Sequence, residues 1–269
     1  MEVLPDVYSL RVDTGAFMGT YPPNVYLVKG ERAAIVDAGY GDEAALSARR
    51  QQLAELGVSQ AAHIIITHHH TDHRAGAEGL RSATGAQVLA HIMEKGLARP
   101  ESTPIPADRW IEGEPELDLG GLHLKLLHTP GHSPGHLCIL IVERGVLFSG
   151  DQVLGVGTTA IEPVLGSMAQ HIASLERLQK LGLDTILPGH GPAIRQPQRK
   201  LQELIEHRSA REEQVLALVG RGVSTVEELF AEVYPELEPR LLDMARGQIR
   251  SHLVKLEQES RVVARDSRY

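Results

Sequence analysis

The sequence has very little cysteine, few aromatic residues and no long apolar run. Cys138 is the only cysteine among 269 residues, which excludes an internal disulfide and is typical of a reducing cytoplasm. The surrounding Leu137–Ile141 run predicts a buried, inert thiol. No apolar stretch approaches the ~20 residues that span a bilayer. Glu2 and Asp6 interrupt the first ten residues, so we expect neither a signal peptide nor a membrane association.

Positive charge is also scarce. The formal net charge of −8 argues against nonspecific binding to nucleic acid. The range Arg240–Arg265 is an exception, because it holds six basic residues against three acidic ones. This local excess is either a solvated helix face or part of a path for a nucleic-acid strand, and the sequence leaves both open.

What the sequence does contain is a histidine-rich stretch after an apolar run. His63–Ile66 has the pattern of a buried strand, and Thr67–His73 follows it with four imidazoles and one carboxylate. Side chains just beyond a strand end can converge on one point while the strand holds their backbone. We therefore expect His68, His70 and their neighbours Asp72 and His73 to bind metal. His69 alternates away from them and is expected either to be structural or to support a ligand from behind.

The same strand-to-loop placement of histidine or aspartate recurs along the chain. Apolar and alternating patterns predict strands, and helical spacing predicts helices between and after them. The proline-containing range 96–121 is predicted to be an irregular connection. The predicted strands cover 7–12, 25–28, 33–36, 63–66, 87–90, 122–127, 137–142, 146–148 and 184–187, and the predicted helices cover 43–56, 75–83, 167–181, 198–219 and 240–257.

The end of the chain has a different pattern, which predicts a second domain. Thr225 and Glu228 form a capping-box sequence that opens a short helix, and a longer helical pattern follows. The range Arg261–Arg265 is predicted to form a terminal β wing. We therefore expect a catalytic α/β domain over residues 1–193 and a winged-helix-like α-helical domain over residues 194–269.

Seven candidate ligands stand at predicted loop ends. Nitrogen and oxygen donors without thiolate favour zinc, manganese or iron. Seven ligands exceed the three or four of one zinc centre, but they suit two ions that share a bridging carboxylate and activate a bridging hydroxide. We thus expect a hydrolase with two divalent ions, first of all zinc, held by His68, His70, Asp72, His73, His132, Asp151 and His190.

These motifs resemble the metallo-β-lactamase superfamily over roughly residues 5–193. The shared pieces are the His-x-His-x-Asp-His run and the Thr-Pro-Gly-His, Ser-Gly-Asp and Pro-Gly-His-Gly segments, in that order. The resemblance implies an αββα sandwich with metals at one edge of its two sheets. It implies that His68, His70 and His132 hold one ion, that Asp72, His73 and His190 hold the other, that Asp151 bridges them, and that Asp37 orients a ligand. For hydrolysis we also expect Asp72 to take part in catalysis by holding or shuttling a proton. From its position alone, Asp37 fits a simple turn equally well.

The C-terminal part resembles the β-lactamase-like protein 2 subgroup, through Gly155–Thr159, His207–Glu212 and the helical tail. Members of that subgroup are similar to endoribonucleases that prefer single strands. The resemblance therefore implies single-stranded RNA as substrate, bound with the help of the C-terminal domain. The chain departs from the subgroup at Gly19–Leu27, next to the expected substrate. The stretch Thr14–Asn24 is predicted to be either a flap over the site or a hairpin loop.

Other functions stay open at this point. The same ligands serve a glyoxalase-II-like thioesterase or a lactonase acting on a small ester or thioester, and superfamily members similar to persulfide dioxygenases bind one iron. A nucleic-acid-binding regulator with a vestigial metal site is a further alternative, which the full ligand set disfavours. A homodimer and a role for His136 also stay open.

Overall fold

The structure is a computed structural model that describes residues 1–11, 21–97, 104–264 and 269. The chain divides into two compact units. The first comprises residues 1–129, 135–157 and 182–197, and the second comprises 130–134, 158–181 and 198–269. The domain boundary after residue 193 stays a prediction.

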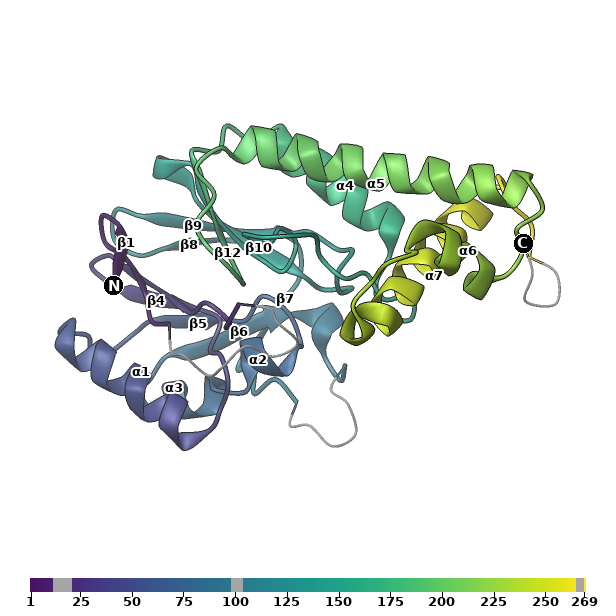
Figure 1. Ribbon diagram of the computed structural model, residues 1–269. Helices are drawn as coiled ribbons and strands as arrows, with labels where there is room; N and C mark the ends of the chain where they lie inside the picture. The colour runs from purple at the N-terminus through teal and green to yellow at the C-terminus, as the bar shows by residue number, and fades with distance from the viewer. Residues whose placement is uncertain (12–20, 98–103, 265–268) are drawn as a thin grey trace. The chain divides into compact units, whose positions relative to one another are not determined.

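A seven-stranded mixed sheet forms one layer of the first unit (Figure 1). Its strands, which lie in chain order, are β1 (Glu2–Leu4), β2 (Val7–Ser9), β3 (Tyr26–Lys29), β4 (Ala33–Val36), β5 (His63–Ile65), β6 (Gln87–His91) and β7 (Arg109–Ile111). Strands β4 to β7 are parallel to one another. Since parallel strands point their carboxyl ends the same way, the loops after β4, β5 and β6 leave from one edge of the sheet.

A five-stranded sheet forms the other strand layer of this unit. In chain order its strands are β8 (Glu116–Asp118), β9 (His123–His128), β10 (Leu137–Ile141), β11 (Val146–Gly150) and β12 (Thr185–Pro188), with the 3-10 helix η2 (Val142–Arg144) between β10 and β11. Neighbours are antiparallel except for β11 and β12, which are parallel. Asp151 and His190 therefore follow neighbouring strand ends that point the same way.

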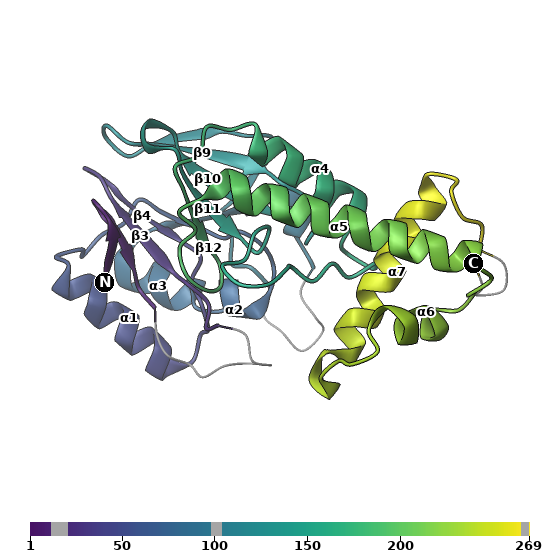
Figure 2. The same cartoon turned by 45° about the horizontal axis from the view of Figure 1, so that its top comes forward.

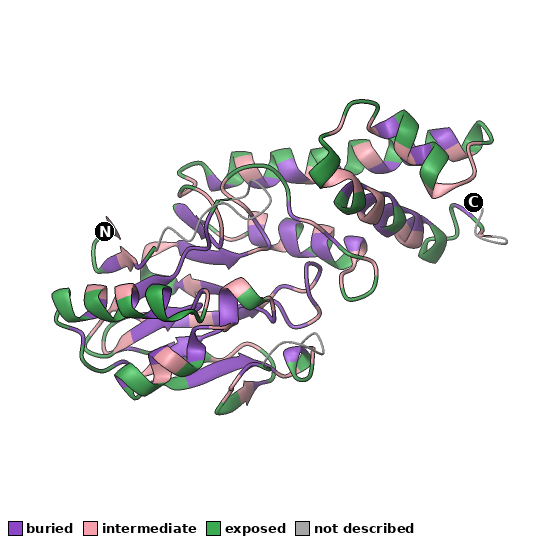
Figure 3. Cartoon of the chain, turned by 60° about the horizontal axis from the view of Figure 1, so that its bottom comes forward, coloured by how far each residue is buried: buried purple, intermediate pink, exposed green. Residues whose placement is uncertain are grey.

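Period-two alternation along the strands builds two apolar layers. Ile64 packs in a cluster that contains side chains of the helices, whereas its neighbour Ile65 packs in the cluster between the two sheets. Ile35 and Val36 divide in the same way. Burial of each such side chain stabilises the fold by ~1.5–3 kcal/mol. The strands are largely coloured as buried in Figure 3, which is the rigid support that the loops at their ends need.

Helices cover the outer face of the seven-stranded sheet (Figure 1). Helix α1 (Glu43–Glu55) begins after Asp42, whose Oδ1 caps it by accepting a hydrogen bond from the Ala45 N–H at 2.9 Å. The other helical segments of this layer are short: α2 (Thr71–Arg74), α3 (Ala77–Thr84) and the 3-10 helix η1 (Ile92–Glu94).

The second unit is helical. It contains α4 (Met168–Gln179), α5 (Pro197–Gly220, in this unit from residue 198), α6 (Val226–Val233), the 3-10 helix η3 (Pro239–Leu241) and α7 (Leu242–Gln258). Thr225 and Glu228 form the predicted capping box at the start of α6. Apolar side chains of α5, α6 and α7 make a common core that includes Leu218, Leu229 and Leu253, and Figure 2 shows α6 beside α7.

The structure confirms the α/β class and corrects three local predictions. The connection over 96–121 is not wholly irregular, because it contains β7 and β8. Strand β1 was not predicted at all. Residues 261–264 form no strand, so the wing prediction is wrong for them, and Arg265 lies outside the described residues. Among the described helices, none is both long enough and apolar enough to cross a membrane.

Candidate metal centre

Loops after three strands bring six of the seven predicted ligands to one edge of the first unit. Four of them follow β5, Asp151 follows β11 and His190 follows β12. The register aligns Val36 with Ile65 and Gly150 with Pro188, so the strand ends are level within each parallel pair. The six residues are His68, His70, Asp72, His73, Asp151 and His190.

The first group of possible ligand atoms includes His68, His70 and Asp151, which lie within 4.8 Å of one another. His68 Nε2 is 2.9 Å from His70 Nδ1. His68 is fully buried, whereas His70 and Asp151 are partly exposed. Within this group, His68 is therefore enclosed by the protein, whereas His70 and Asp151 form the side that a small molecule can reach.

Asp72, His73 and His190 form the second group, also within 4.8 Å. His190 Nε2 lies 3.2 Å from His73 Nε2 and 3.3 Å from Asp72 Oδ2. Asp151 Oδ1 lies 3.4 Å from His73 Nε2 and 3.6 Å from His190 Nε2. Asp151 thus reaches both groups, which is the position that a bridging carboxylate requires.

The seventh predicted ligand, His132, belongs to the second unit. It lies in the segment 130–134, between the end of β9 and the start of β10. Its Nδ1 is 2.8 Å from the carbonyl oxygen of Ala160, a residue of the same unit. Because this oxygen is an acceptor, Nδ1 carries the proton and the Nε2 lone pair is left for another partner. Its role as a ligand stays a prediction.

The donor atoms fit divalent metal ions. Four ligands at ~2.0–2.2 Å from a tetrahedral ion lie ~3.3 Å from one another. The separations of 2.9 to 3.6 Å between the nitrogen and oxygen atoms above are close to this value. Imidazole and carboxylate donors without sulfur suit zinc, manganese or iron. The cluster is therefore able to bind metal ions.

Asp37 orients His73 within this cluster. Its Oδ2 accepts a hydrogen bond from His73 Nδ1 at 2.7 Å, and its Oδ1 accepts one from the Thr67 N–H at 2.8 Å. Asp37 is buried and has a left-handed backbone with φ of 60°. A carboxylate that holds Nδ1 leaves Nε2 to face the other donors. Asp37 thus contacts two segments beyond its own turn, and its role in orienting a metal ligand stays a prediction.

Negative charge dominates the electrostatics of the cluster. Burial lowers the pKa of His73, but the charges of Asp151, Asp37 and Asp72 outweigh burial and hold this pKa well above its ordinary value. Burial raises the pKa of Asp72, yet His73 and His190 bring it down to about 2. The Asp72 carboxylate is therefore ionised at neutral pH, and its negative charge attracts cations to the cluster.

His136 supports Asp151, a role that the sequence left open. Its Nε2 accepts a hydrogen bond from the Asp151 N–H at 3.1 Å, and its Nδ1 lies 3.0 Å from Thr129 Oγ1. The imidazole is fully buried. It therefore fixes the backbone that carries the carboxylate shared by both groups.

The described end of the Thr14–Asn24 stretch supports His190. The Tyr21 carbonyl accepts a hydrogen bond from His190 Nδ1 at 2.7 Å. Asn24 Nδ2 donates to the carbonyls of Pro188 and Gly191, at 2.9 Å each. Residues 14–20 of the stretch lie outside the described residues, so the choice between flap and hairpin loop stays open. At its described end, the stretch holds the His190 loop in place.

Sequence reasoning missed Glu94. This residue at the end of η1 is 1% exposed, and its carboxylate accepts hydrogen bonds from the His69 and Gly135 N–H groups. It also accepts one from the His69 ring, so His69 Nδ1 faces Glu94, while the His69 ring lies edge-on to the His70 ring with 4.7 Å between the ring centroids. The sequence signal was only a single glutamate shortly after a predicted strand, a pattern that surface glutamates share.

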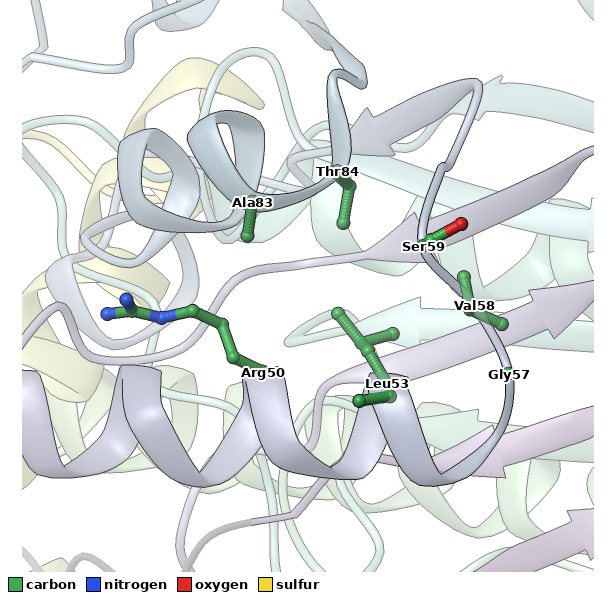
Figure 4. Close-up of a pocket in the computed structure, with 8 residues that line it drawn as sticks. Arg50, Leu53, Gly57, Val58, Ser59, Ala83 and Thr84 are labelled. Atoms are coloured by element: carbon green, nitrogen blue, oxygen red, sulfur yellow. The ribbon is translucent and has the colours of Figure 1, made fainter.

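A hollow of about 510 Å³ lies between α1 and α3, away from the metal-binding cluster (Figure 4). Leu53, Val58 and Thr84 line it, with Arg50 at one end. The Arg50 guanidinium pairs with Glu43 at 2.9 Å. None of the predicted ligands lines this hollow, and Val58 precedes β5, at the opposite end of that strand from the ligand loop.

The fold and cluster together define a protein with two stacked sheets and a metal-binding edge. Residues 18–190 match the family model described as the metallo-beta-lactamase superfamily, and residues 225–268 match a beta-lactamase associated winged helix domain. The chain belongs to the metallo-β-lactamase superfamily and is a hydrolase of that fold with a winged-helix domain. The predicted family and fold class are confirmed.

Two curated proteins illustrate the range of its relatives. The chain is 29% identical to a Beta-lactamase-like protein 2 homolog of Drosophila melanogaster, over 97% of this chain and 94% of that protein. It is also 29% identical to an Atrochrysone carboxyl ACP thioesterase of Aspergillus fumigatus, over 82% of this chain and 70% of that protein. The first likeness agrees with the predicted subgroup.

A solved structure is similar over the whole chain. A metallo-beta-lactamase family protein from Thermus thermophilus aligns with a TM-score of 0.80 and 29% identity, covering 100% of this chain and 99% of that one. A beta-lactamase domain protein from Burkholderia ambifaria aligns with a TM-score of 0.83 at 23% identity, over 100% of this chain and 92% of that one, which supports the fold alone.

Proposed function

We propose that this protein hydrolyses an acyl thioester at a centre of two divalent ions, first of all zinc. The seven ligands would be His68, His70, His132, Asp72, His73 and His190, with Asp151 shared between the ions. A metal ion bound there would act as a Lewis acid and would lower the pKa of water toward ~7. A small thioester in the cytoplasm is the substrate that we expect.

One observation carries the choice of a thioester over RNA. Of the five described basic side chains in the local excess Arg240–Arg261, four pair with carboxylates of their own unit. The pairs are Arg240–Glu238, Arg246–Glu227, Lys255–Glu212 and Arg261–Glu213, with separations of 2.6 to 2.9 Å. Cations that are already paired release few counterions on binding RNA and so contribute little affinity. The net charge of −8 acts in the same direction.

The side chains of the chain itself have separate tasks in this proposal. Asp37 and the Tyr21 carbonyl hold His73 and His190 by Nδ1, which leaves the Nε2 atoms for the ions. His136 fixes the backbone of Asp151. With a pKa of about 2, Asp72 stays ionised near neutral pH, so in catalysis it accepts a hydrogen bond from the water rather than donating a proton.

The Aspergillus fumigatus relative supports the thioester proposal, since that protein is an Atrochrysone carboxyl ACP thioesterase. A second candidate is the endoribonuclease that acts on single-stranded RNA. It is favoured by the likeness to the Beta-lactamase-like protein 2 homolog, which extends over 97% of this chain and therefore includes the winged-helix domain.

A comparison of substrates at defined metal content tests the proposal. Protein loaded with zinc or manganese would be assayed on acyl-coenzyme A thioesters, unstructured RNA and lactones, and iron-loaded protein on a persulfide with oxygen uptake. We expect thioester hydrolysis, and loss of this activity in His68→Ala. RNA cleavage that His68→Ala abolishes, with thioesters left intact, would favour the second candidate. Oxygen uptake with one iron per chain would overturn both.

A further inference from the structure

We propose that Glu94 is a positioning residue that ties together the two loops carrying histidines of the metal centre. This inference rests on the proposed function, because it concerns the residues that would hold the ions. The loops are residues 66–70, after β5, and residues 129–136, between β9 and β10.

Each of the two Glu94 carboxylate oxygens accepts hydrogen bonds from a different loop. Oε2 accepts hydrogen bonds from the His69 backbone N–H at 2.8 Å and from His69 Nδ1 at 2.6 Å. Oε1 accepts one from the Gly135 N–H at 2.7 Å. The partners are 25 and 41 residues away along the chain. A single side chain thus fixes two loops that come from different sheets.

The His69 contacts act on ligands on both sides. His69 lies between His68 and His70, and Glu94 binds both its backbone and its ring, while Arg74 Nε donates to its carbonyl at 2.5 Å. The His69 N–H belongs to the peptide group before this residue and its carbonyl to the one after it, so neither peptide group can rotate without breaking one of these bonds. The direction in which the two neighbouring imidazoles point is therefore set by a residue that is not itself a ligand.

The Gly135 contact acts on the other loop. Gly135 precedes His136, whose imidazole accepts the hydrogen bond from the Asp151 N–H. A Cβ atom at residue 135 would lie 2.9 Å from both Cγ and the backbone nitrogen of Glu94, so this close approach requires glycine. Glycine and glutamate together set the distance between the loop and η1.

Burial gives these bonds their importance. The Glu94 side chain has no exposed area, and a carboxylate away from water is strongly destabilising unless donors compensate it. The three N–H donors from the two loops provide that compensation through charge-assisted hydrogen bonds. The loops and Glu94 are therefore stable only together, and loss of the charge should release both loops.

The variant Glu94→Gln tests this role. The glutamine amide presents an NH₂ group where one carboxylate oxygen was. This group is a donor and cannot accept a hydrogen bond, so the N–H donors of one loop or the other lose their acceptor. We expect the zinc dissociation constant, measured by competition with a chromophoric chelator, to rise 10–100-fold. The matched control is Glu78→Gln, whose side chain is 58% exposed on α3, and which should bind zinc like the wild type.

A purely structural role predicts a different result. In that case the Glu94→Gln melting temperature would fall, while the folded protein, checked by circular dichroism, would bind zinc with a dissociation constant within twofold of the wild-type value. That outcome would overturn the proposal.

His69→Ala offers a milder variant, because the backbone contact with Glu94 survives. His69→Ala should raise the zinc dissociation constant by a smaller factor than Glu94→Gln does. In the double variant, His69→Ala should raise this constant further by a smaller factor than it does in the wild type. Fully additive effects, or unchanged zinc binding in His69→Ala, would contradict the account.

The zinc readout separates this inference from the proposed function. If the wild type binds zinc and Glu94→Gln weakens binding, but no thioester is hydrolysed, then only the substrate proposal fails. If the wild type hydrolyses thioesters and Glu94→Gln binds zinc normally, then only the role of Glu94 fails.

Discussion

Asp37 Oδ2 accepts a hydrogen bond from His73 Nδ1 at 2.7 Å, across 36 residues of sequence. The bond joins the loop after β4 to the helix that follows the β5 loop, and it turns Nε2 of a fully buried imidazole toward Asp151 and His190. The parallel pairing of β4 with β5 makes this possible, because it brings both strand ends to one edge.

Asp37→Asn should weaken zinc binding 10–100-fold with little loss of folding. Asparagine is the best replacement, since it tolerates the left-handed backbone at this position and removes only the charge. Zinc content after dialysis against a chelator measures the effect. Asp243→Asn is the control because its side chain is fully exposed. Equal zinc retention in the two variants would show that Asp37 does not orient a ligand.

Gly189→Ala should disrupt the metal cluster while leaving the fold intact. A Cβ at this residue would lie 2.5 Å from Asp151 Oδ1 and 2.8 Å from His73 Cε1, so both side chains must shift. We expect at least a tenfold loss of zinc affinity. Gly182→Ala is the control, because its Cβ would meet nothing within 4 Å. Normal zinc binding by Gly189→Ala would mean that the two groups are not tightly packed around this glycine.

Glu212→Gln should destabilise the second unit. Glu212 is buried and accepts hydrogen bonds from Lys255 Nζ at 2.9 Å and Arg261 Nη1 at 3.0 Å. Loss of its charge should lower the free energy of unfolding by about 3 kcal/mol, the low end for breaking a buried ion pair. Denaturant unfolding measures it, and Glu213→Gln, whose side chain is 66% exposed, is the control with a small effect.

The same carboxylate predicts how stability depends on pH. Burial raises the pKa of Glu212, but His252 and Lys255 outweigh burial and lower it from 4.5 to about 2. A lowered folded-state pKa gives stability that is fully present above pH ~4.5 and is lost as the pH falls toward ~2. The stability gap between the wild type and Glu212→Gln should therefore close across this acidic window. A gap that stays constant down to pH 2 would show that Glu212 does not carry the shifted pKa.

The site residues that could be predicted from sequence are donor side chains that directly follow a recognisable strand pattern. His68, Asp151 and His190 each follow an apolar strand pattern, so strand, loop and donor were visible together. Thr225 was visible as a cap for a similar reason, because a cap depends on residues within one helical turn.

What could not be predicted depends on partners distant in sequence. Strand β7 (Arg109–Ile111) has three residues and exists through its pairing with β6, about 20 residues earlier, rather than through its own alternation. Glu94 is important through hydrogen bonds to His69 and Gly135, and its own neighbourhood in sequence carries no sign of them.

The central claim is that the cluster holds two ions and that both are needed for hydrolysis. Zinc titration of metal-free protein, with thioester hydrolysis followed at each addition, tests it most directly. We predict two zinc ions per wild-type chain, with activity that appears only as the second site fills, and one ion per chain with no activity in His190→Ala. A single ion in the wild type, or full activity at one zinc per chain, would contradict the account.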